Sequence, residues 1–251
     1  MLVSVIVPAY NEEIAVRQVL MDIADQNDAL TVMGHQLEII LVANACTDTT
    51  VAQAHAVSQL YQPSFYDVST TSRYNPFPRF KIVEESRQGY GWAHRRGMAE
   101  SAGDIIITLD CDNTYPVKDI PRIVKEFMAP CPQCDEPVDA VFTNRLTDDA
   151  HMSTVSRTGN FLLSLAIRLL HGNVPRDSQS GMWAYRREMM TVLFAGVGSG
   201  MELSEQTKLR LAGEARCWSD IDIDYYERLG ESKLNPVRDG IRCLWRVLTT
   251  V

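Results

Sequence analysis

Two aspartates one residue apart, Asp110 and Asp112, are the side chains in this sequence best suited to chemistry. They follow the apolar run from Ile105 to Leu109, which is typical of a central parallel strand. Ligands of open α/β sheets bind at the carboxyl ends of the strands. Two carboxylates this close repel each other unless a cation lies between them, and Mg²⁺ or Mn²⁺ prefers such oxygen ligands together with phosphate oxygens. An isolated Asp-x-Asp is also typical of an acidic turn, so the surrounding sequence has to decide.

Alternating strands and helices surround this pair. We expect a helix that Asn11 caps, with an apolar stripe from Val16 to Ile23, and a long amphipathic helix at residues 154–171. Strands separated by helical stretches predict an α/β fold with a doubly wound, mainly parallel sheet flanked by helices. The other expected strands are at residues 2–7, 37–42, 80–83, 138–143, 182–185 and 221–226, and the other expected helices at about 47–60, 91–101, 117–128, 187–194, 202–212 and 236–248.

Length and composition narrow the class of protein. The 251 residues suffice for one large α/β domain or two small ones, and the net charge of -8 argues against a general nucleic-acid binder. No apolar run reaches the roughly 18 residues that span a bilayer. The first expected strand begins almost at Met1, which leaves no room for a signal peptide. We therefore expect a cytoplasmic protein with reduced thiols.

The six cysteines are scattered along the chain, and only Cys131-Pro-Gln-Cys134 has the spacing of metal ligands. A zinc site needs a second such pair, whereas Cys217 and Cys243 each stand alone in the sequence. We therefore expect a loop with incidental thiols rather than a metal or redox site.

The first strand-to-helix turn indicates which nucleotide chemistry fits. A dinucleotide-binding dehydrogenase needs glycines there, so that a pyrophosphate can reach the helix N-terminus. Residues 8–13 contain no glycine and two carboxylates, which excludes that class, and the Gly-rich, Arg-containing loop of a sugar nucleotidyltransferase is also absent. A nucleoside over this turn and a diphosphate on a cation at Asp110 and Asp112 fit better. Such a cation would neutralise the charge that builds on a departing nucleoside diphosphate, which is glycosyl-transfer chemistry.

Five segments in order resemble the signatures of family 2 glycosyltransferases of the GT-A fold, closest to the polyprenyl (dolichyl) phosphate sugar synthase branch. The likeness covers nearly the whole chain, and each motif is weak alone. The segments are residues 5–13, 42–50, 88–97, the Asp110-Cys-Asp112 metal motif, and the pair at 181–188 and 225–234. The resemblance implies a single GT-A domain over residues 1–251, with a nucleotide-sugar-binding half at 1–116 and an acceptor-binding half at 117–251 that ends in an amphipathic helix.

The resemblance also implies a donor site in the first half of the chain. Asp110 would reach toward the ribose and the metal, and Asp112 would be the firmest ligand of Mg²⁺ or Mn²⁺. In lipid-phosphate synthases a further polar ligand lies two residues after the second aspartate, where this chain has Thr114. The other donor-binding candidates are Pro8, Tyr10, Glu12, Asn44, Asp48, Gln88, Gly89, Gly91 and Cys111. Glu12 and Asp48 could equally be first-turn helix acids, and the two glycines could simply permit a sharp turn.

The acceptor side offers both cations and carboxylates. A lipid phosphate is already ionised and needs cations, whereas a hydroxyl acceptor needs a general base. The candidates for the base are Glu202 and Glu205, with an ordinary acid on a helix face as the alternative. The candidates for contact with a phosphate acceptor are Arg145, Arg157, Gly181, Arg228, Ser232 and Lys233, with ordinary surface charge as the alternative for the arginines.

We therefore predict a metal-dependent, inverting glycosyltransferase that uses a nucleoside diphosphate sugar, with a polyprenyl phosphate as the expected acceptor. Transfer to a hydroxyl of a soluble glycan or small molecule is one alternative, and a nucleotide-sugar-binding protein without turnover is another. The C-terminal segment 241–248 mixes Trp, Leu and Arg as interfacial helices do, which makes it a candidate for peripheral contact with the inner face of the membrane. The apolar stretch 161–170 is expected to pack on the catalytic domain instead.

Overall fold

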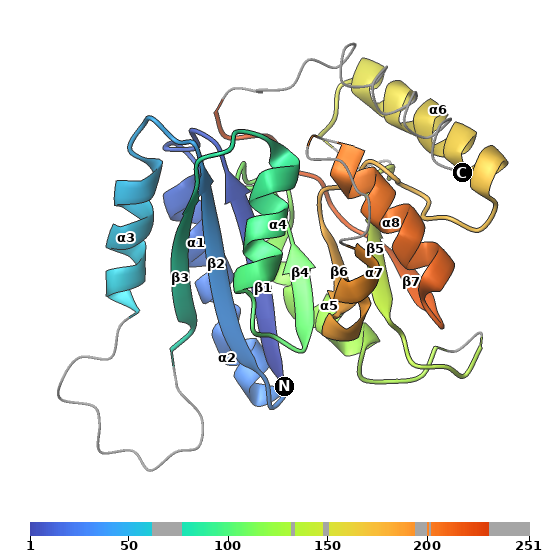
Figure 1. The fold of residues 1–251 in the computed structure, drawn as a ribbon, viewed down its shortest axis with the longest axis horizontal. Coiled ribbons are helices and arrows are strands. Elements are labelled where there is room, and N and C mark those ends of the chain that lie inside the picture. Colours follow the sequence, from blue (N-terminus) through green and yellow to red (C-terminus); the bar gives the residue numbers. More distant parts are fainter. Residues whose placement is uncertain (62–76, 132–133, 148–150, 194–199, 201, 231–251) are drawn as a thin grey trace.

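A seven-stranded, mainly parallel sheet forms the centre of the molecule (Figure 1). A computed structural model describes residues 1–61, 77–131, 134–147, 151–193, 200 and 202–230. The strand order is β3-β2-β1-β4-β6-β5-β7, and β6 runs antiparallel to both of its neighbours while the other pairs are parallel. This confirms the predicted doubly wound sheet. The strands are β1 (Leu2–Ala9), β2 (Gln36–Asn44), β3 (Arg79–Glu85), β4 (Ile105–Thr108), β5 (Ala140–Asn144), β6 (Trp183–Arg186) and β7 (Trp218–Asp222).

Helices cover both faces of the sheet because successive strand residues point to opposite faces and both sets are apolar. In β1, for example, Val5 and Val7 join one buried cluster with the helices α1, α3 and α5, whereas Ile6 joins a second cluster with α4, α7 and α8. The helices are α1 (Val16–Ala24), α2 (Asn27–Val32), α3 (Thr50–Leu60), α4 (Tyr90–Glu100), α5 (Ile120–Glu126), α6 (Thr154–His171), α7 (Met190–Leu193) and α8 (Glu202–Glu214).

The topology brings several of the predicted site residues to one edge of the sheet. Strands β1, β2, β3 and β4 are mutually parallel, so the turns that follow them lie at the same edge. Strands β5 and β7 share that direction, because β6 is antiparallel to both β4 and β5. Asp110 follows β4 and Arg145 follows β5, so both halves of the chain contribute to this edge.

Three expectations about elements are wrong. Asn11 does not cap α1, because its backbone is left-handed (φ 54°) and its side chain bonds to Thr47 instead. The last strand is β7 rather than residues 221–226, because the chain leaves β5 after Ile223 and turns toward the sheet edge. Residues 117–128 divide into a short 3₁₀ turn (Val117–Asp119) and α5. The expected helix at 236–248 lies outside the described residues.

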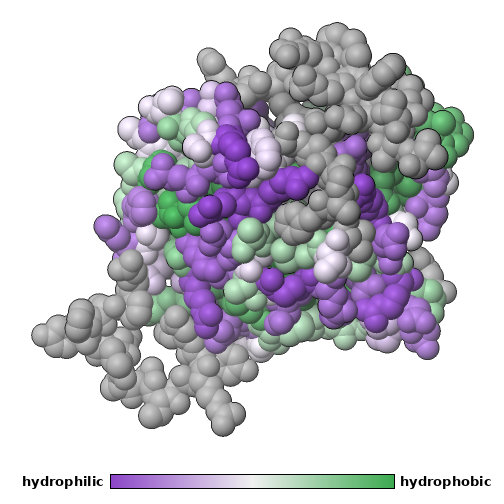
Figure 2. Space-filling model, in the orientation of Figure 1, coloured by the Kyte–Doolittle hydropathy of each residue, from purple (hydrophilic) through white to green (hydrophobic). Residues whose placement is uncertain are grey.

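Helix α6 has the predicted bounds but not the predicted burial. Its inward contacts are made by Leu163 and Ile167, which pack with Val174 and with Leu209 of α8. A larger apolar face remains exposed, and Figure 2 shows apolar surface at the right edge, where Figure 1 places this helix. The expectation that residues 161–170 pack on the domain is therefore only partly met. The exposed apolar residues of α6 are Val155, Phe161, Leu162, Leu165, Leu169 and Leu170. Within the described residues, no helix is long and apolar enough to cross a bilayer.

Candidate active site

The two aspartates lie together in the buried turn that follows β4. Asp110 accepts a hydrogen bond at Oδ1 from the Tyr90 hydroxyl (3.1 Å), and Gly181 packs so closely on Oδ2 that a Cβ there would overlap it. Asp112 is 4% exposed and accepts hydrogen bonds at Oδ1 from the Thr114 amide (3.1 Å) and hydroxyl (2.6 Å). Burial, together with the neighbouring charge of Asp112, raises the pKa of Asp110 to about 6. The surroundings therefore do not fully compensate the negative charge of Asp110.

Arg228 supplies one cation to this pair. Its Nη2 lies 2.6 Å and its Nε 3.0 Å from Oδ2 of Asp112, and the Leu229 amide donates to the Asp112 carbonyl. The same segment is fixed a second time by the Tyr226 amide, which donates to the Thr114 carbonyl. Arg228 was predicted to contact an acceptor phosphate, and the structure places it at the paired aspartates themselves.

The oxygen atoms at this turn suit a hard divalent ion. Asp110 and Asp112 provide carboxylate oxygens from one tight turn, and the raised pKa of Asp110 persists although Arg228 is already paired with Asp112. A divalent cation would relieve that repulsion, so the residues present fit Mg²⁺ or Mn²⁺. Thr114 donates its hydroxyl proton to Asp112 and therefore orients this carboxylate.

The turn after β1 is tied to the loop after β2 by hydrogen bonds. The side-chain amide of Asn11 accepts from the Thr47 backbone N–H at Oδ1 (2.8 Å) and donates from Nδ2 to the Thr47 hydroxyl (3.2 Å). Asp48 lies just before α3, outside its first turn, and accepts from the backbone N–H groups of Thr50 (3.0 Å) and Glu13 (3.2 Å). These bonds lower the pKa of Asp48 against the opposing effect of partial burial. Of the residues predicted to contact the nucleoside, Pro8 is buried, Tyr10 and Glu12 are half-buried, and the Glu12 amide donates to Thr50.

Asn44 fixes the turn that leads into α4. Its side chain donates to the carbonyls of Glu85 (3.2 Å) and Arg87 (2.8 Å) and accepts from the Gly89 amide (2.8 Å). Gly89 has a φ of 144°, which L side chains rarely adopt, so glycine is required there for the turn. Asn44 therefore orients this turn, and its predicted contact with a base stays a prediction. Of the neighbouring candidates, Gln88 is exposed, whereas Gly91 and Cys111 are buried.

A buried ion pair dominates the other side of the site. Arg145 donates from Nε to Oδ2 of Asp177 (2.7 Å) and from Nη2 to Oδ1 (3.1 Å), and Asp177 is 0% exposed. The Arg145 guanidinium also lies 5.1 Å from the ring centre of Tyr225. Burial opposes the charge of Asp177, but Arg145 holds the pKa of this carboxyl below its ordinary value. Because Asp177 balances its charge, Arg145 acts here as a buried structural cation.

Two residues of α8 complete this buried charge cluster. Glu205 is 2% exposed and accepts from Gln179 (2.9 Å), while Lys208 is 1% exposed and donates to the Ser180 carbonyl (2.6 Å). Burial lowers the pKa of Lys208 to about 8, against the attraction of Asp177 and Glu205. The segment 177–181 thus connects the ion pair, Glu205, Lys208 and the Gly181 contact with Asp110.

Some candidates lie elsewhere or outside the description. Arg157 is half-buried on α6, and Glu202 begins α8 with a side chain that the structure does not describe. Ser232 and Lys233 lie outside the described residues. Sequence reasoning missed Tyr90, Asp177 and Lys208. Lys208 follows Glu205 by three residues on the same helix, and that spacing was the available signal.

Comparisons with known proteins identify the family of this chain. Residues 4–194 match the family described as Glycosyl transferase family 2. A dolichyl-phosphate hexose transferase of Haloferax volcanii is 30% identical over 64% of this chain and 67% of its own length. An undecaprenyl-phosphate 4-deoxy-4-formamido-L-arabinose transferase of Pseudomonas fluorescens is 27% identical over 94% of this chain. That match spans 61% of the Pseudomonas protein, so the chain covers about three fifths of its length.

A solved structure supports the fold. Glucosyl-3-phosphoglycerate synthase from Mycobacterium tuberculosis, in complex with Mn²⁺, UDP and phosphoglyceric acid, superposes with a TM-score of 0.62 at 22% identity. The match covers 99% of this chain and 76% of that one. At this identity the likeness shows the fold, which is the GT-A type expected from the sequence. The match over residues 4–194 covers most of the chain, which therefore belongs to glycosyl transferase family 2.

Proposed function

We propose that this protein transfers a sugar from a nucleoside diphosphate sugar to a polyprenyl phosphate, in one displacement that inverts the anomeric carbon and depends on Mg²⁺ or Mn²⁺. The observation that carries the proposal is the carboxylate pair at the sheet edge, the half-buried Asp110 and the buried Asp112, with the pKa of Asp110 raised to about 6. Two such acids at this edge suit a cation and a diphosphate.

The residues around the pair have distinct roles in this proposal. Asp110 and Asp112 would hold the divalent ion, which when bound would neutralise charge on the leaving nucleoside diphosphate. Tyr90 and Thr114 position the two carboxylates through the hydrogen bonds described above. Arg228 adds a fixed positive charge beside Asp112, where the diphosphate would lie. The turns held by Asn44 and Asp48 would border the nucleoside.

Three features support a lipid phosphate as the acceptor. The relatives from Haloferax and Pseudomonas are named for transfer involving dolichyl and undecaprenyl phosphate. A phosphate acceptor is ionised at neutral pH and needs no general base. The exposed apolar face of α6 offers a surface for a lipid chain or a membrane interface, so we propose peripheral contact there as well as through the C-terminal segment.

A hydroxyl acceptor is the second candidate, and Glu205 is the observation in its favour. This carboxylate is buried near the segment 177–181, as a general base next to a reacting hydroxyl would be. The two acceptor classes make opposite predictions for Glu205→Gln. Transfer to a lipid phosphate should continue, whereas transfer to a hydroxyl should fall by at least a hundredfold, or about 2.7 kcal/mol.

A two-stage experiment tests the proposal. Thermal shifts with UDP, GDP, CDP and dTDP, each with and without Mn²⁺, identify the nucleotide, because ligand binding raises the unfolding temperature. Release of that nucleotide from its sugar conjugates is then measured with polyprenyl phosphate in detergent. Undiminished turnover in excess chelator contradicts the metal assignment. Metal-dependent nucleotide binding without transfer to any acceptor supports the alternative of a binding protein.

A further inference from the structure

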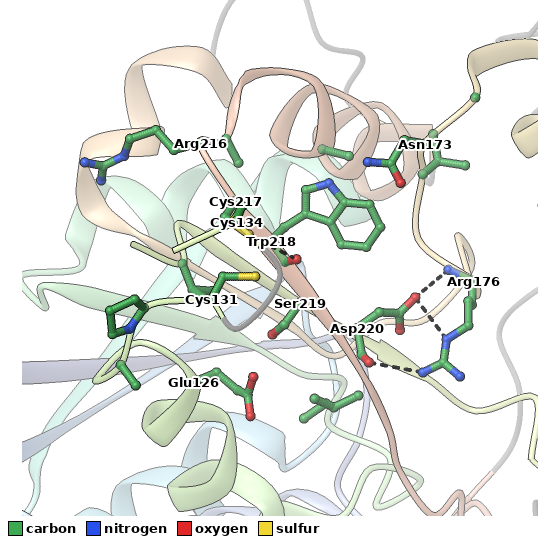
Figure 3. Close-up of a pocket in the computed structure, with 18 of the residues that line it drawn as sticks. Glu126, Cys131, Cys134, Asn173, Arg176, Arg216, Cys217, Trp218, Ser219 and Asp220 are labelled. Carbon is green, nitrogen blue, oxygen red and sulfur yellow. Dashed lines mark hydrogen bonds and ion pairs between the residues drawn. The ribbon is translucent and has the colours of Figure 1, made fainter. Parts of the chain in front are cut away.

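Three cysteines from two distant segments meet at one place in the described part of the chain. The sulfur atoms of Cys131, Cys134 and Cys217 all lie within 4.8 Å of one another. Figure 3 shows them at one end of an open hollow between α5 and the start of β7. The sequence presents Cys217 as a lone cysteine, whereas the fold brings it to the loop that carries Cys131 and Cys134.

We propose that Cys131, Cys134 and Cys217 bind Zn²⁺ as thiolates, with water as the fourth ligand. Zn–S bonds of about 2.3 Å in a tetrahedral site place the sulfurs about 3.8 Å apart. The observed cluster therefore needs only small side-chain movements to close around an ion. Within the described residues, this group contains no histidine or carboxylate.

The loop that carries the first two thiols is built tightly. The Cys131 amide donates to the Glu136 carbonyl (2.8 Å), the Asp135 amide donates to the Cys131 carbonyl (2.9 Å), and Pro130 pairs with Pro137. Asp135, directly after Cys134, has a left-handed backbone (φ 56°), a conformation that costs free energy in a residue other than glycine. This turn directs both thiols of the loop toward Cys217.

Ligand chemistry separates this cluster from the paired aspartates. Soft thiolates favour zinc, whereas carboxylate oxygens favour Mg²⁺ or Mn²⁺. Two of the three cysteines could instead form a disulfide, which would leave one thiol over, and the experiment below distinguishes that outcome.

The position of the cluster separates it from the paired aspartates. Cys217 directly precedes β7, whereas the paired aspartates lie at the edge toward which β5 and β7 run. The cluster is thus at the opposite end of the sheet. A metal there would tie the loop after α5 to the strand that leads to Arg228, and so stabilise the second half of the chain.

Metal analysis of the full-length protein tests this inference. Purified under reducing conditions from cells supplied with zinc, the protein should contain about one zinc per chain by inductively coupled plasma mass spectrometry. Cobalt reconstitution should give the sulfur-to-metal charge-transfer absorption of a thiolate site. Cys134→Ser removes an exposed ligand and should lose most of the metal, whereas Cys46→Ser, a cysteine outside the cluster, should retain it.

The outcomes separate this site from the proposed activity. Asp112→Asn should keep its zinc, and a chelator should lower the unfolding temperature of the wild type more than that of Cys134→Ser. Absence of bound zinc and of a cobalt spectrum in folded, reduced protein overturns the inference. So does equal metal loss from Cys46→Ser, or a disulfide among the three cysteines in protein purified with zinc. If Cys243→Ser halves the zinc content, Cys243 rather than water is the fourth ligand.

Discussion

At the site edge, Asn44 and Asp48 of the first half are held by backbone groups, whereas Arg145 and Asp177 of the second half are held by their opposite charges. The Asn44 side chain donates hydrogen bonds to two backbone carbonyls and accepts one from a backbone N–H, and Asp48 accepts from two backbone amides. Arg145 and Asp177, in contrast, hold each other inside the protein. The first arrangement shapes turns, and the second fixes a segment far away in sequence.

The contrast has an energetic consequence. A lost neutral hydrogen bond leaves a polar group unsatisfied, at a cost of about 1–3 kcal/mol. A lost partner in a buried ion pair leaves a charge in the interior, at a cost of about 3–5 kcal/mol. Substitutions of Arg145 or Asp177 should therefore affect folding more strongly than substitutions of Asn44 or Asp48.

Asp112 belongs to both arrangements, since Thr114 donates to one of its oxygens and Arg228 pairs with the other. We expect Asp112→Asn to lower the transfer rate about a thousandfold, equivalent to about 4 kcal/mol, by weakening metal binding. Initial rates and the Mn²⁺-dependent thermal shift with nucleotide measure this. Asp28→Asn, an exposed acid on α2, is the matched control. An unchanged Mn²⁺-dependent shift would remove Asp112 from the metal site.

Arg145→Met tests the charged arrangement directly. It should lower the free energy of unfolding by about 3–5 kcal/mol, because Asp177 would remain buried without its partner. The double variant with Asp177→Leu should recover most of that loss. Urea unfolding of wild type, both single variants and the double variant forms the cycle. If the unfolding free energies lost in the two single variants add up to the loss in the double variant, Arg145 and Asp177 are not coupled. The contrast with the residues held by backbone groups then fails.

Asn44→Ala tests the backbone-held arrangement. We expect a smaller loss of about 1–3 kcal/mol in unfolding free energy, together with weaker nucleotide binding as the Gly89 turn loosens. Asn173→Ala replaces an exposed asparagine and controls for the substitution itself. A loss as large as that of Arg145→Met would show that the two halves do not differ in this way.

His94, fully buried on α4, has the smallest effect near neutral pH, and its effect grows as the pH falls. Burial, and secondarily the charge of Lys208, lowers its pKa to about 3 from 6.5. Below about pH 6.5 the His94 imidazole is therefore protonated in the unfolded chain but stays neutral in the folded protein. Stability should fall by about 1.4 kcal/mol per pH unit as the pH drops from 6.5 toward 3.

Denaturant unfolding at several pH values between 4 and 7 measures this slope. His94→Gln should flatten it, and His55→Gln, an exposed histidine of α3, should leave it as in the wild type. The same slope in wild type and His94→Gln would place the acid sensitivity in other groups.

Local patterns in the sequence predicted elements well and long-range polar contacts poorly. Helix α6 matched its predicted bounds because Ser153 caps it and its apolar residues follow a helical period. Asp110 and Asp112 were identifiable because they follow a uniformly apolar strand. The pairing of Arg145 with Asp177 and the meeting of Cys217 with Cys131 depend on the assembled sheet, and no local period encodes them. Asn44 was expected to border the base, and its hydrogen bonds to the backbone of the Gly89 turn could not be predicted because that turn is distant in sequence.

Strand β6 lies between β4 and β5 although it comes after both in the chain. A fragment that ended at residue 116 would contain the paired aspartates but would expose one side of β4, whose four residues are all buried in the intact protein. An uncovered apolar edge strand recruits other chains and promotes aggregation. Residues 1–116 and residues 117–251 should therefore be inseparable by truncation, and only the full sheet would yield a soluble, folded product.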